Sequence, residues 1–302
     1  MPPPRCWSHP TCRENGEAAP ELFEDDTEWD AALTEAGACQ SAAQMRQLFV
    51  VILTSCGPNS PRELFDKFWT EMAETWAWRR KHAYPGAYPA DGMPAVNEND
   101  KHALLFDLEA RLANFALNQC LDYGLPKPDP TKVLGADAVP DGVRELREAR
   151  DYDQGEQAAA AADSRAKMDT NPEQRDGLAR VPGEPFTFFS ADSVAPGDDQ
   201  ASDYPVEFLN SLRITGLPLH EIKVKVGCVL MLLRNLDPKN GLCNGTRFVL
   251  TRIHDHMLEG VIITGDFITQ RVLVPRITLQ LSDSRFPFTL RRRQFPVRVA
   301  FA

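Results

Sequence analysis

The stretch IKVKVGCVLMLL, residues 222–233, decides the fold of the C-terminal third of this 302-residue chain. Its first five residues alternate apolar and basic side chains, a pattern typical of a strand with one buried face. Its last five residues, Val229–Leu233, form the short apolar run of a fully buried strand. The sequence DPKNG at residues 237–241 predicts a turn, because proline restricts one backbone dihedral and Asn-Gly tolerates positive φ.

Further short strands are predicted up to the C-terminus. Residues 247–253, 258–264, 271–275 and 286–291 have strand patterns, and turn residues separate them. Five or six short strands of this kind favour a small barrel or sandwich.

Residues 41–150 predict helices instead. Ser60-Pro61-Arg62-Glu63 is a capping box with proline at the first helical position, and apolar residues follow it three to four positions apart. We expect a second helix from about Asp100 to near Gly124, where Gly and Pro126 would end it. Its buried residues would be Leu104, Leu108, Leu112 and Phe115. The first helix carries the aromatic residues Phe68, Trp69, Trp76 and Trp78, whose helical spacing favours a packed core over a base-stacking surface.

The segments outside these regions are expected to lack a packed core. Residues 1–40 combine proline and acidic residues with few periodic apolar positions, so we predict disorder. Cys6, His9 and Cys12 match no zinc-site spacing, so no metal site is expected there. Residues 151–203 are polar and rich in Ala, Asp, Ser and Gly, and predict a flexible tether.

The bulk composition narrows the class of protein. The chain has room for two domains, and 43% apolar residues is normal for globular protein. No run of 18 apolar residues occurs, and the N-terminus lacks the apolar core of a secretory signal, so no membrane partner is expected. Seven cysteines, an odd number, suit the reduced thiols of an intracellular protein.

The net charge of −10 conceals a split between the two parts of the chain. Residues 1–200 contain 19 Lys and Arg against 35 Asp and Glu, a balance of −16. Residues 201–302 contain 14 against 8, a balance of +6. A basic, strand-rich last third can attract phosphate backbones, although the same charges also suit an ordinary solvated surface.

The pentapeptide NPEQR, residues 171–175, has two explanations. Asn171 as N-cap, Pro172 at the first helical position and Gln174 two residues later account for it as a helix start. It also resembles the Q motif that Helitron-type helicases of the Pif family place before their phosphate-binding loop. No G-x-x-x-x-G-K-[ST] loop, which would hold nucleotide phosphates, occurs in the 302 residues.

Longer segments carry the same resemblance. The accessory 2B domain of Pif-family helicases in their Helitron form is similar to YPVEFLNSL at 204–212, to residues 225–237, to GLCNGTR at 241–247 and to residues 292–302. FTFFSADSV at 186–194 resembles a strand of the second motor domain, and residues 47–128 resemble the region upstream of the motor. The resemblance covers roughly residues 42–302 and is most specific over 204–302.

The resemblance implies a fold, an activity of the family, and the loss of that activity in this chain. The fold class would be α+β, with an N-terminal helical region, a flexible tether and a C-terminal small SH3-like β-barrel of the 2B type with remnant RecA-like strands. The family unwinds DNA with ATP and magnesium in transposition, recombination or repair, which implies an intracellular, nuclear protein, and Gln174 would read the adenine edge. A RecA-like domain needs more than roughly 100 residues, and only six lie between Gln174 and Val181. The chain also stops at Ala302, before the family's arginine finger. We therefore expect a truncated relative without ATPase activity, with no cofactor of its own and no catalytic residues.

The predicted organisation has five parts. These are a disordered N-terminus over 1–40, a helical region over 41–150, a tether with the Q-motif remnant and one motor strand over 151–203, a 2B-like β domain over 204–296 and a truncated motor strand over 297–302. The two motor strands, Phe186–Phe189 and Val297–Phe301, are expected to pair with each other as a lone ribbon or to stay unpaired, because most of their sheet is absent.

Single-stranded DNA and an intact helicase relative are the candidate partners. The predicted nucleic-acid-binding residues are Lys223, Lys225, Arg234, Lys239, Arg247, Arg252, Arg292 and Arg293. Alternating lysines on a strand are equally explained as its solvated face. A second class of function is a non-catalytic interaction module that docks onto an intact relative. An independent enzymatic site has little support, because His254 and His256 flank Asp255 in what looks like a turn.

Overall fold

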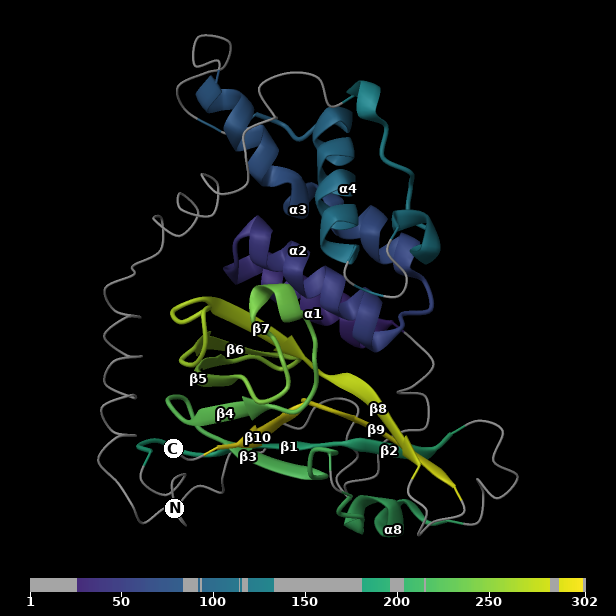
Figure 1. Ribbon diagram of the computed structural model, residues 1–302, viewed down its shortest axis with the longest axis vertical. Coiled ribbons are helices and arrows are strands. Elements are labelled where there is room, and N and C mark those ends of the chain that lie inside the picture. The colour runs from purple at the N-terminus through teal and green to yellow at the C-terminus, as the bar shows by residue number, and fades with distance from the viewer. Residues whose placement is uncertain are drawn as a thin grey trace. The chain divides into compact units, whose positions relative to one another are not determined.

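The computed structural model describes residues 26–83, 92, 94–113, 115, 119–132, 181–195, 204–214, 216–282 and 288–300 (Figure 1). The chain divides into two compact units. We call the described part of Asp26–Glu156 the helical unit and the described part of Gln157–Ala302 the β unit. Gln174, the Ala158–Ala162 run and Cys6, His9 and Cys12 all lie outside the described residues.

The helical unit consists of four α-helices and three shorter helical turns. Its elements are α1 (Thr27–Cys39), α2 (Ala42–Val51), a π-helical turn (Ile52–Cys56), α3 (Pro61–Ala83), α4 (Glu98–Leu112) and 3₁₀ turns at Cys120–Tyr123 and Pro130–Lys132. Two helices begin at complete capping boxes, formed by Ser41 with Gln44 and by Asn97 with Asp100. The core lies where the apolar stripes of the four helices meet, and Leu33, Phe49, Phe65, Met72 and Leu104 are fully buried there.

A buried arginine is part of this helical core. The Arg46 side chain is fully buried, and its Nε lies 2.9 Å from a carboxylate oxygen of Asp107 on α4. Its Nη1 donates a 2.7 Å hydrogen bond to the carbonyl of Met72 on α3, and its guanidinium lies 4.7 Å from the centroid of the Trp76 ring. Arg46 therefore links α2, α3 and α4 through one charged group.

The helical predictions are partly confirmed. α3 begins at Pro61, and Phe68 and Trp76 are buried in the core as predicted. The second helix starts near Asp100 as expected but ends at Leu112, and a separate 3₁₀ turn begins after extended Gln119. Gly124, with φ of 69°, ends that 3₁₀ turn rather than α4.

The segment predicted to be disordered contains a helix. α1 occupies residues 27–39, and its Trp29, Leu33 and Ala36 are buried. Of the acidic residues on α1, Asp30 forms an exposed ion pair with Lys67 of α3 at 2.6 Å, whereas Glu28 is buried. The prediction was therefore wrong for this part, since a single amphipathic helix can be ordered by its packing partners.

The β unit contains three antiparallel sheets and one short helix, α8 (Val206–Ser211). Two strands, β1 (Phe186–Phe189) and β3 (Glu221–Val224), form the first sheet, and β2 (Ala191–Val194), β9 (Thr289–Gln294) and β8 (Ile277–Ser282) form the second. The largest sheet has the order β10-β4-β5-β6-β7. Its strands are β10 (Val297–Val299), β4 (Val229–Leu232), β5 (Arg247–Ile253), β6 (Met257–Ile262) and β7 (Arg271–Pro275).

Most of the predicted strands are present, but β8 was not predicted, and the predicted segment 286–291 is shifted by three residues from β9. β4 and β5 coincide with the predicted segments, and the predicted turn at 237–241 contains a 3₁₀ turn that ends at Gly241 with φ of 80°. A Cβ at Gly241 would also lie 2.7 Å from Cγ of Phe267, so both the backbone and the space require glycine here.

The mixed α+β class is confirmed, but the described strands form no closed barrel. The five-stranded sheet ends at β10 and β7, and no pairing joins these two strands in the described part of the chain. Between β7 and β8 lies only Arg276, so the chain passes directly from this sheet into the three-stranded one (Figure 1). Within the described residues the five-stranded sheet is therefore open, and a single residue connects it to the three-stranded sheet.

The two strands predicted to form a lone ribbon have other partners. β1 pairs with β3 over four residues, and β10 pairs with β4 through Val297↔Leu232. Phe188 packs edge-to-face against Phe295 at 5.0 Å, and Val297 is 1% exposed. The prediction was wrong because both strands complete sheets of the β unit itself. Among the described helices, none is long and apolar enough to cross a membrane.

Candidate nucleic-acid interface

The basic residues predicted from the sequence lie in three different environments. Lys223 is on β3, in the two-stranded sheet, and Lys225 follows the end of this strand. The Nζ of Lys223 lies 2.8 Å from Oε1 of Glu221 in an exposed ion pair, and Lys225 donates a 3.0 Å hydrogen bond to the carbonyl of Val181. An exposed pair of this kind contributes little free energy, so Lys223 fits the solvated-face explanation. Lys239 is exposed on the 237–241 turn, and Arg234 is half-buried just after β4.

Arg292 and Arg293 are in the interior and cannot meet a phosphate at the surface. Their exposed fractions are 0% and 3%, on the middle strand of the three-stranded sheet. The sequence showed three consecutive arginines but not their partners. These two residues are therefore removed from the candidate set.

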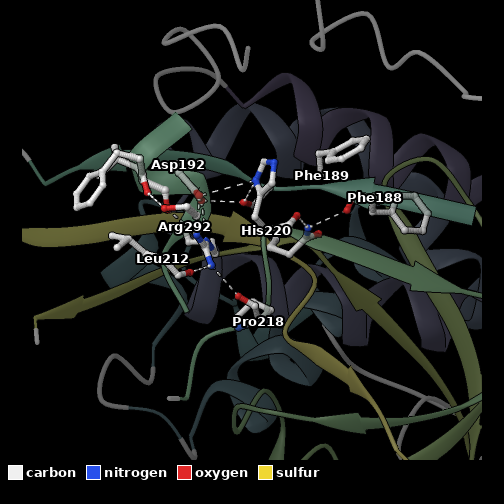
Figure 2. Close-up of polar contacts among 12 residues, drawn as sticks. Phe188, Phe189, Asp192, Leu212, Pro218, His220 and Arg292 are labelled. Atoms are coloured by element: carbon white, nitrogen blue, oxygen red, sulfur yellow. Dashed lines mark hydrogen bonds and ion pairs between the residues drawn. The ribbon is translucent and has the colours of Figure 1, made fainter. Parts of the chain in front are cut away.

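The partner of Arg292 is Asp192, one hundred positions earlier in the chain (Figure 2). Two hydrogen bonds, from Nε at 2.8 Å and Nη2 at 2.7 Å, hold the fully buried carboxylate of Asp192. The remaining donors reach the carbonyls of Leu209 at 3.0 Å, Pro218 at 3.0 Å and Leu212 at 3.2 Å. All five N–H donors of the guanidinium are thus used.

This cluster fixes the local structure where α8 meets the sheets. Leu209 and Leu212 lie in and just after α8, and Pro218 precedes β3, whereas Asp192 is on β2. Ser190 donates to Asp192 Oδ1 at 2.8 Å and contacts His220 Nδ1 at 2.9 Å. The geometry is that of a structural ion pair with satisfied neighbours, not of a nucleophile with its base.

The pKa of His220 provides a test of this cluster. Burial of the ring lowers its pKa from 6.5; Asp192 opposes this shift, and the Arg292 guanidinium adds to it. Because the folded-state pKa lies below that of the unfolded chain, the unfolded state takes up the proton first as the pH falls. Stability of the β unit should therefore fall as the pH drops through 6.5 towards the folded pKa, and level off below it.

The measurement is urea unfolding at pH 7.5 and at pH 5.0. Hydrogen exchange of β-unit peptides, corrected for the intrinsic exchange rate at each pH, monitors the unfolding. The expected result is that His220→Gln reduces the loss of stability between the two pH values. His82→Gln, on the exposed end of α3, is the matched histidine control. An unchanged pH dependence in His220→Gln would contradict the assignment.

One face of the five-stranded sheet gathers a set of arginines. Arg298 on β10, Met231 on β4 and Arg247 on β5 are direct cross-strand partners, because the pairs Arg298↔Met231 and Met231↔Arg247 share one register. Directly opposite residues project from the same side of an antiparallel sheet. Arg298 is exposed and Arg247 is half-buried.

A β-bulge adds a third arginine to this face. Leu250 lies opposite Gly260 and Arg252 lies opposite Glu259, so Thr251 is the extra residue between them. Simple alternation along β5 would place Arg252 on the side opposite to Arg247. The bulge reverses this, since bulges redirect the side chains that follow them. We call the surface with Arg247, Arg252 and Arg298 the arginine face.

The acidic group on the same side is already neutralised. Glu259 is 1% exposed, and Arg271 Nη1 lies 3.2 Å from its Oε1, with His254 Nε2 3.6 Å from its Oε2. Within the described residues, Arg247, Arg252 and Arg298 form no ion pair. Arg252 and Arg298 are exposed and Arg247 is half-buried, whereas Val249 and Val261 on the same side of the sheet are buried in an apolar cluster. The arginine face therefore carries three arginines without a paired carboxylate around this cluster.

Arg298 was missed by the sequence analysis. It lies in a segment interpreted as a truncated motor strand, so its position beside Met231 was not considered. The alternation Val297-Arg298-Val299 was a detectable strand pattern, but only the register shows which residues it joins. His254 and His256 lie in the loop between β5 and β6, as predicted, and the described residues contain no cluster of ligands suited to a metal ion.

Comparison with known protein families finds a match for one part of the chain. Residues 207–253 match the 2B domain of the DNA helicase Pif1, from within α8 to the end of β5. Arg247 and Arg252 of the arginine face, and Met231 between Arg247 and Arg298, lie inside this match. Arg298 lies outside it. No curated protein matches the chain.

Solved structures show only distant similarity. Pif1 helicase from Candida albicans has a TM-score of 0.30 and 19% identity, over 45% of this chain and 33% of that chain. Unliganded Pif1 from Bacteroides sp has a TM-score of 0.28 and 17% identity, over 45% and 37% of the two chains. Bacteroides Pif1 bound to ssDNA has a TM-score of 0.26 and 18% identity, over 46% and 28%. The match thus spans less than two fifths of each of these proteins.

Proposed function

We propose that the β unit, whose residues 207–253 match the 2B domain of the DNA helicase Pif1, binds single-stranded DNA through the arginine face without sequence preference. The observation that carries the proposal is the in-register row Arg298–Met231–Arg247, with Arg252 brought to the same side by the bulge. The formal net charge of +6 over residues 201–302 also supports the proposal.

The chemistry of the row suits a phosphate backbone. Guanidinium groups form charge-assisted hydrogen bonds to phosphate oxygens and cannot lose their charge at physiological pH. Adjacent strands lie about 4.8 Å apart, so the strands that carry Arg247 and Arg298 are separated by about 10 Å. Long side chains at that separation can contact different phosphates of one strand.

The salt dependence of binding should be steep and should depend on these three residues. Three phosphate contacts predict a log–log slope of about −2 for a single strand, or a loss of about 20-fold between 50 and 200 mM salt. Arg247→Gln, Arg252→Gln and Arg298→Gln together should remove most of this slope and weaken binding at 50 mM salt by a similar factor. Fluorescence anisotropy with a labelled oligothymidylate measures both quantities.

The control variant removes the same charge elsewhere. Arg62→Gln, Lys67→Gln and Lys132→Gln lie on the helical unit, where all three residues are exposed. This variant should keep both the affinity and the slope. If it weakens binding as much as the arginine-face variant does, the binding depends on net charge alone and the proposed site is wrong.

We also propose, as the resemblance implies, that the chain is a truncated relative of Helitron-type Pif helicases and that it hydrolyses no ATP. The support is the missing G-x-x-x-x-G-K-[ST] loop, whose backbone amides and lysine position the phosphates. Purified protein should release phosphate from ATP at the background rate, with or without single-stranded DNA. DNA-stimulated release that Gln174→Ala abolishes would overturn the proposal.

A second candidate function is docking onto an intact helicase relative. The observation that favours it is the exposure of two large apolar side chains on the helical unit, Phe106 at 36% and Leu121 at 53%. The two functions differ in their response to salt, since apolar docking should persist at 500 mM salt where phosphate contacts are lost.

A further inference from the structure

Three aromatic rings that are distant in sequence meet beside α8. The centroid of the Tyr204 ring lies 4.4 Å from that of Phe288 and 5.8 Å from that of Phe208. The planes of Tyr204 and Phe208 differ by only 26°, so these two rings are stacked. Phe208 and Phe288 are 6.5 Å apart in an edge-to-face arrangement.

The exposed fraction of the rings increases from Phe288 through Tyr204 to Phe208. Phe288 is 4% exposed, Tyr204 is half-buried and Phe208 is 37% exposed. Tyr204 thus lies between a core ring and a surface ring. We call these three side chains the aromatic stack.

The backbone that carries Phe208 is held in place. Arg292 donates to the carbonyl of Leu209, the residue after Phe208 in α8, and to that of Leu212, the C-cap of the helix. The Ser211 hydroxyl donates to the carbonyl of Phe208 at 2.7 Å. A surface ring fixed in this way loses little conformational entropy when a planar group is placed on it.

We propose that the aromatic stack is a platform for a nucleobase of single-stranded DNA, with Phe208 as the contacting ring. The proposal rests on the proposed function, because it assigns a base contact to the same ligand whose phosphates meet the arginine face. Every base has a π-face, so stacking adds affinity without sequence preference.

Charge is what favours a nucleic acid as the occupant. Arg213 is exposed two residues after α8, although Glu207 in the first turn of α8 is exposed as well. Residues 201–302 carry an excess of six positive charges, and of their basic residues Arg292 and Arg293 are buried. A single strand offers both of the groups that this surface suits, planar bases and negative phosphates. An apolar protein segment would use the rings but not the positive charge.

The test compares DNA with and without bases in the full-length protein. Anisotropy titrations would use a labelled oligothymidylate and an abasic oligonucleotide of equal length. Phe208→Ala should weaken binding of the oligothymidylate by about 5- to 150-fold, the range for loss of one stacked base. It should leave binding of the abasic oligonucleotide unchanged. Phe208→Trp, which keeps a π-face, should bind the oligothymidylate at least as tightly as the original protein.

Phe186→Ala is the control, because Phe186 is 38% exposed on β1 and is not part of the aromatic stack. It should change neither affinity. If Phe208→Ala weakens both probes equally, or neither, the platform is wrong while DNA binding by the arginine face stands. If the original protein binds neither probe, the proposed function itself has failed and this inference fails with it.

Discussion

Replacing Asp192 by alanine should destabilise the β unit by about 3–5 kcal/mol, because it leaves the Arg292 charge buried without its counter-ion. Arg292 is fully buried, and the three carbonyls that it contacts cannot neutralise it. The same change also loosens α8 and the chain before β3, since one guanidinium holds both to the three-stranded sheet.

Urea unfolding, monitored by pulsed alkylation of Cys228, measures this loss of stability. Cys228 is 2% exposed, and burial raises the pKa of its thiol to about 11, so it reacts only when the β unit opens. Tryptophan fluorescence would not report on this unit, because no tryptophan lies after Trp78.

Two further variants separate the buried charge from the lost contact. Glu221→Ala breaks the exposed pair with Lys223 and should cost no more than about 1 kcal/mol. The double variant Asp192→Leu with Arg292→Met removes both charges and should recover much of the loss seen in Asp192→Ala. A single variant as stable as the original protein would show that the ion pair does not support the fold.

Replacing Asp107 by alanine should have a comparable effect on the helical unit, about 3–5 kcal/mol. Asp107 is the carboxylate 2.9 Å from Nε of the fully buried Arg46, and Arg111 contacts it at 2.8 Å. The other groups that contact the Arg46 guanidinium include the Met72 carbonyl, the Thr75 hydroxyl and the Trp76 ring, and none of these three carries a charge.

Tryptophan fluorescence during urea unfolding is the suitable measurement here, because Trp29, Trp69, Trp76 and Trp78 are all in the helical unit. Asp66→Ala is the matched control. It breaks the Arg62–Asp66 pair on α3, whose side chains are 50% and 45% exposed, and should cost at most about 1 kcal/mol. Equal losses in the two variants would mean that burial of Arg46 is not the cause.

The candidate site was only partly accessible from the sequence. Arg247 and Arg252 were selected because they are basic residues in a strand segment, and the structure brings both to one face. Arg252 reaches that face only through the bulge at Thr251, which no residue pattern announces. Arg298 required the β10–β4 register, and Arg292 was misassigned because its partner is 100 positions away.

The sequence by itself determined the features that depend on neighbouring residues. Apolar spacing and proline placed α3 at Pro61, a short apolar run placed β4, a strand pattern placed β5, and Asn-Gly predicted the turn that ends at Gly241. These features follow from local backbone preference and from periodic burial, which a short window of residues contains.

Only the tertiary structure decided which segments meet. It paired β1 with β3 and β10 with β4, buried Arg292 against Asp192, ordered α1 against other helices and left the sheets open. Each of these depends on the free energy of contacts between residues far apart in the chain, and a register or an ion pair is selected only when all competing partners are present. A run of three arginines therefore contains one residue that holds the interior together, whereas an isolated Arg298 lies on the surface proposed to meet DNA.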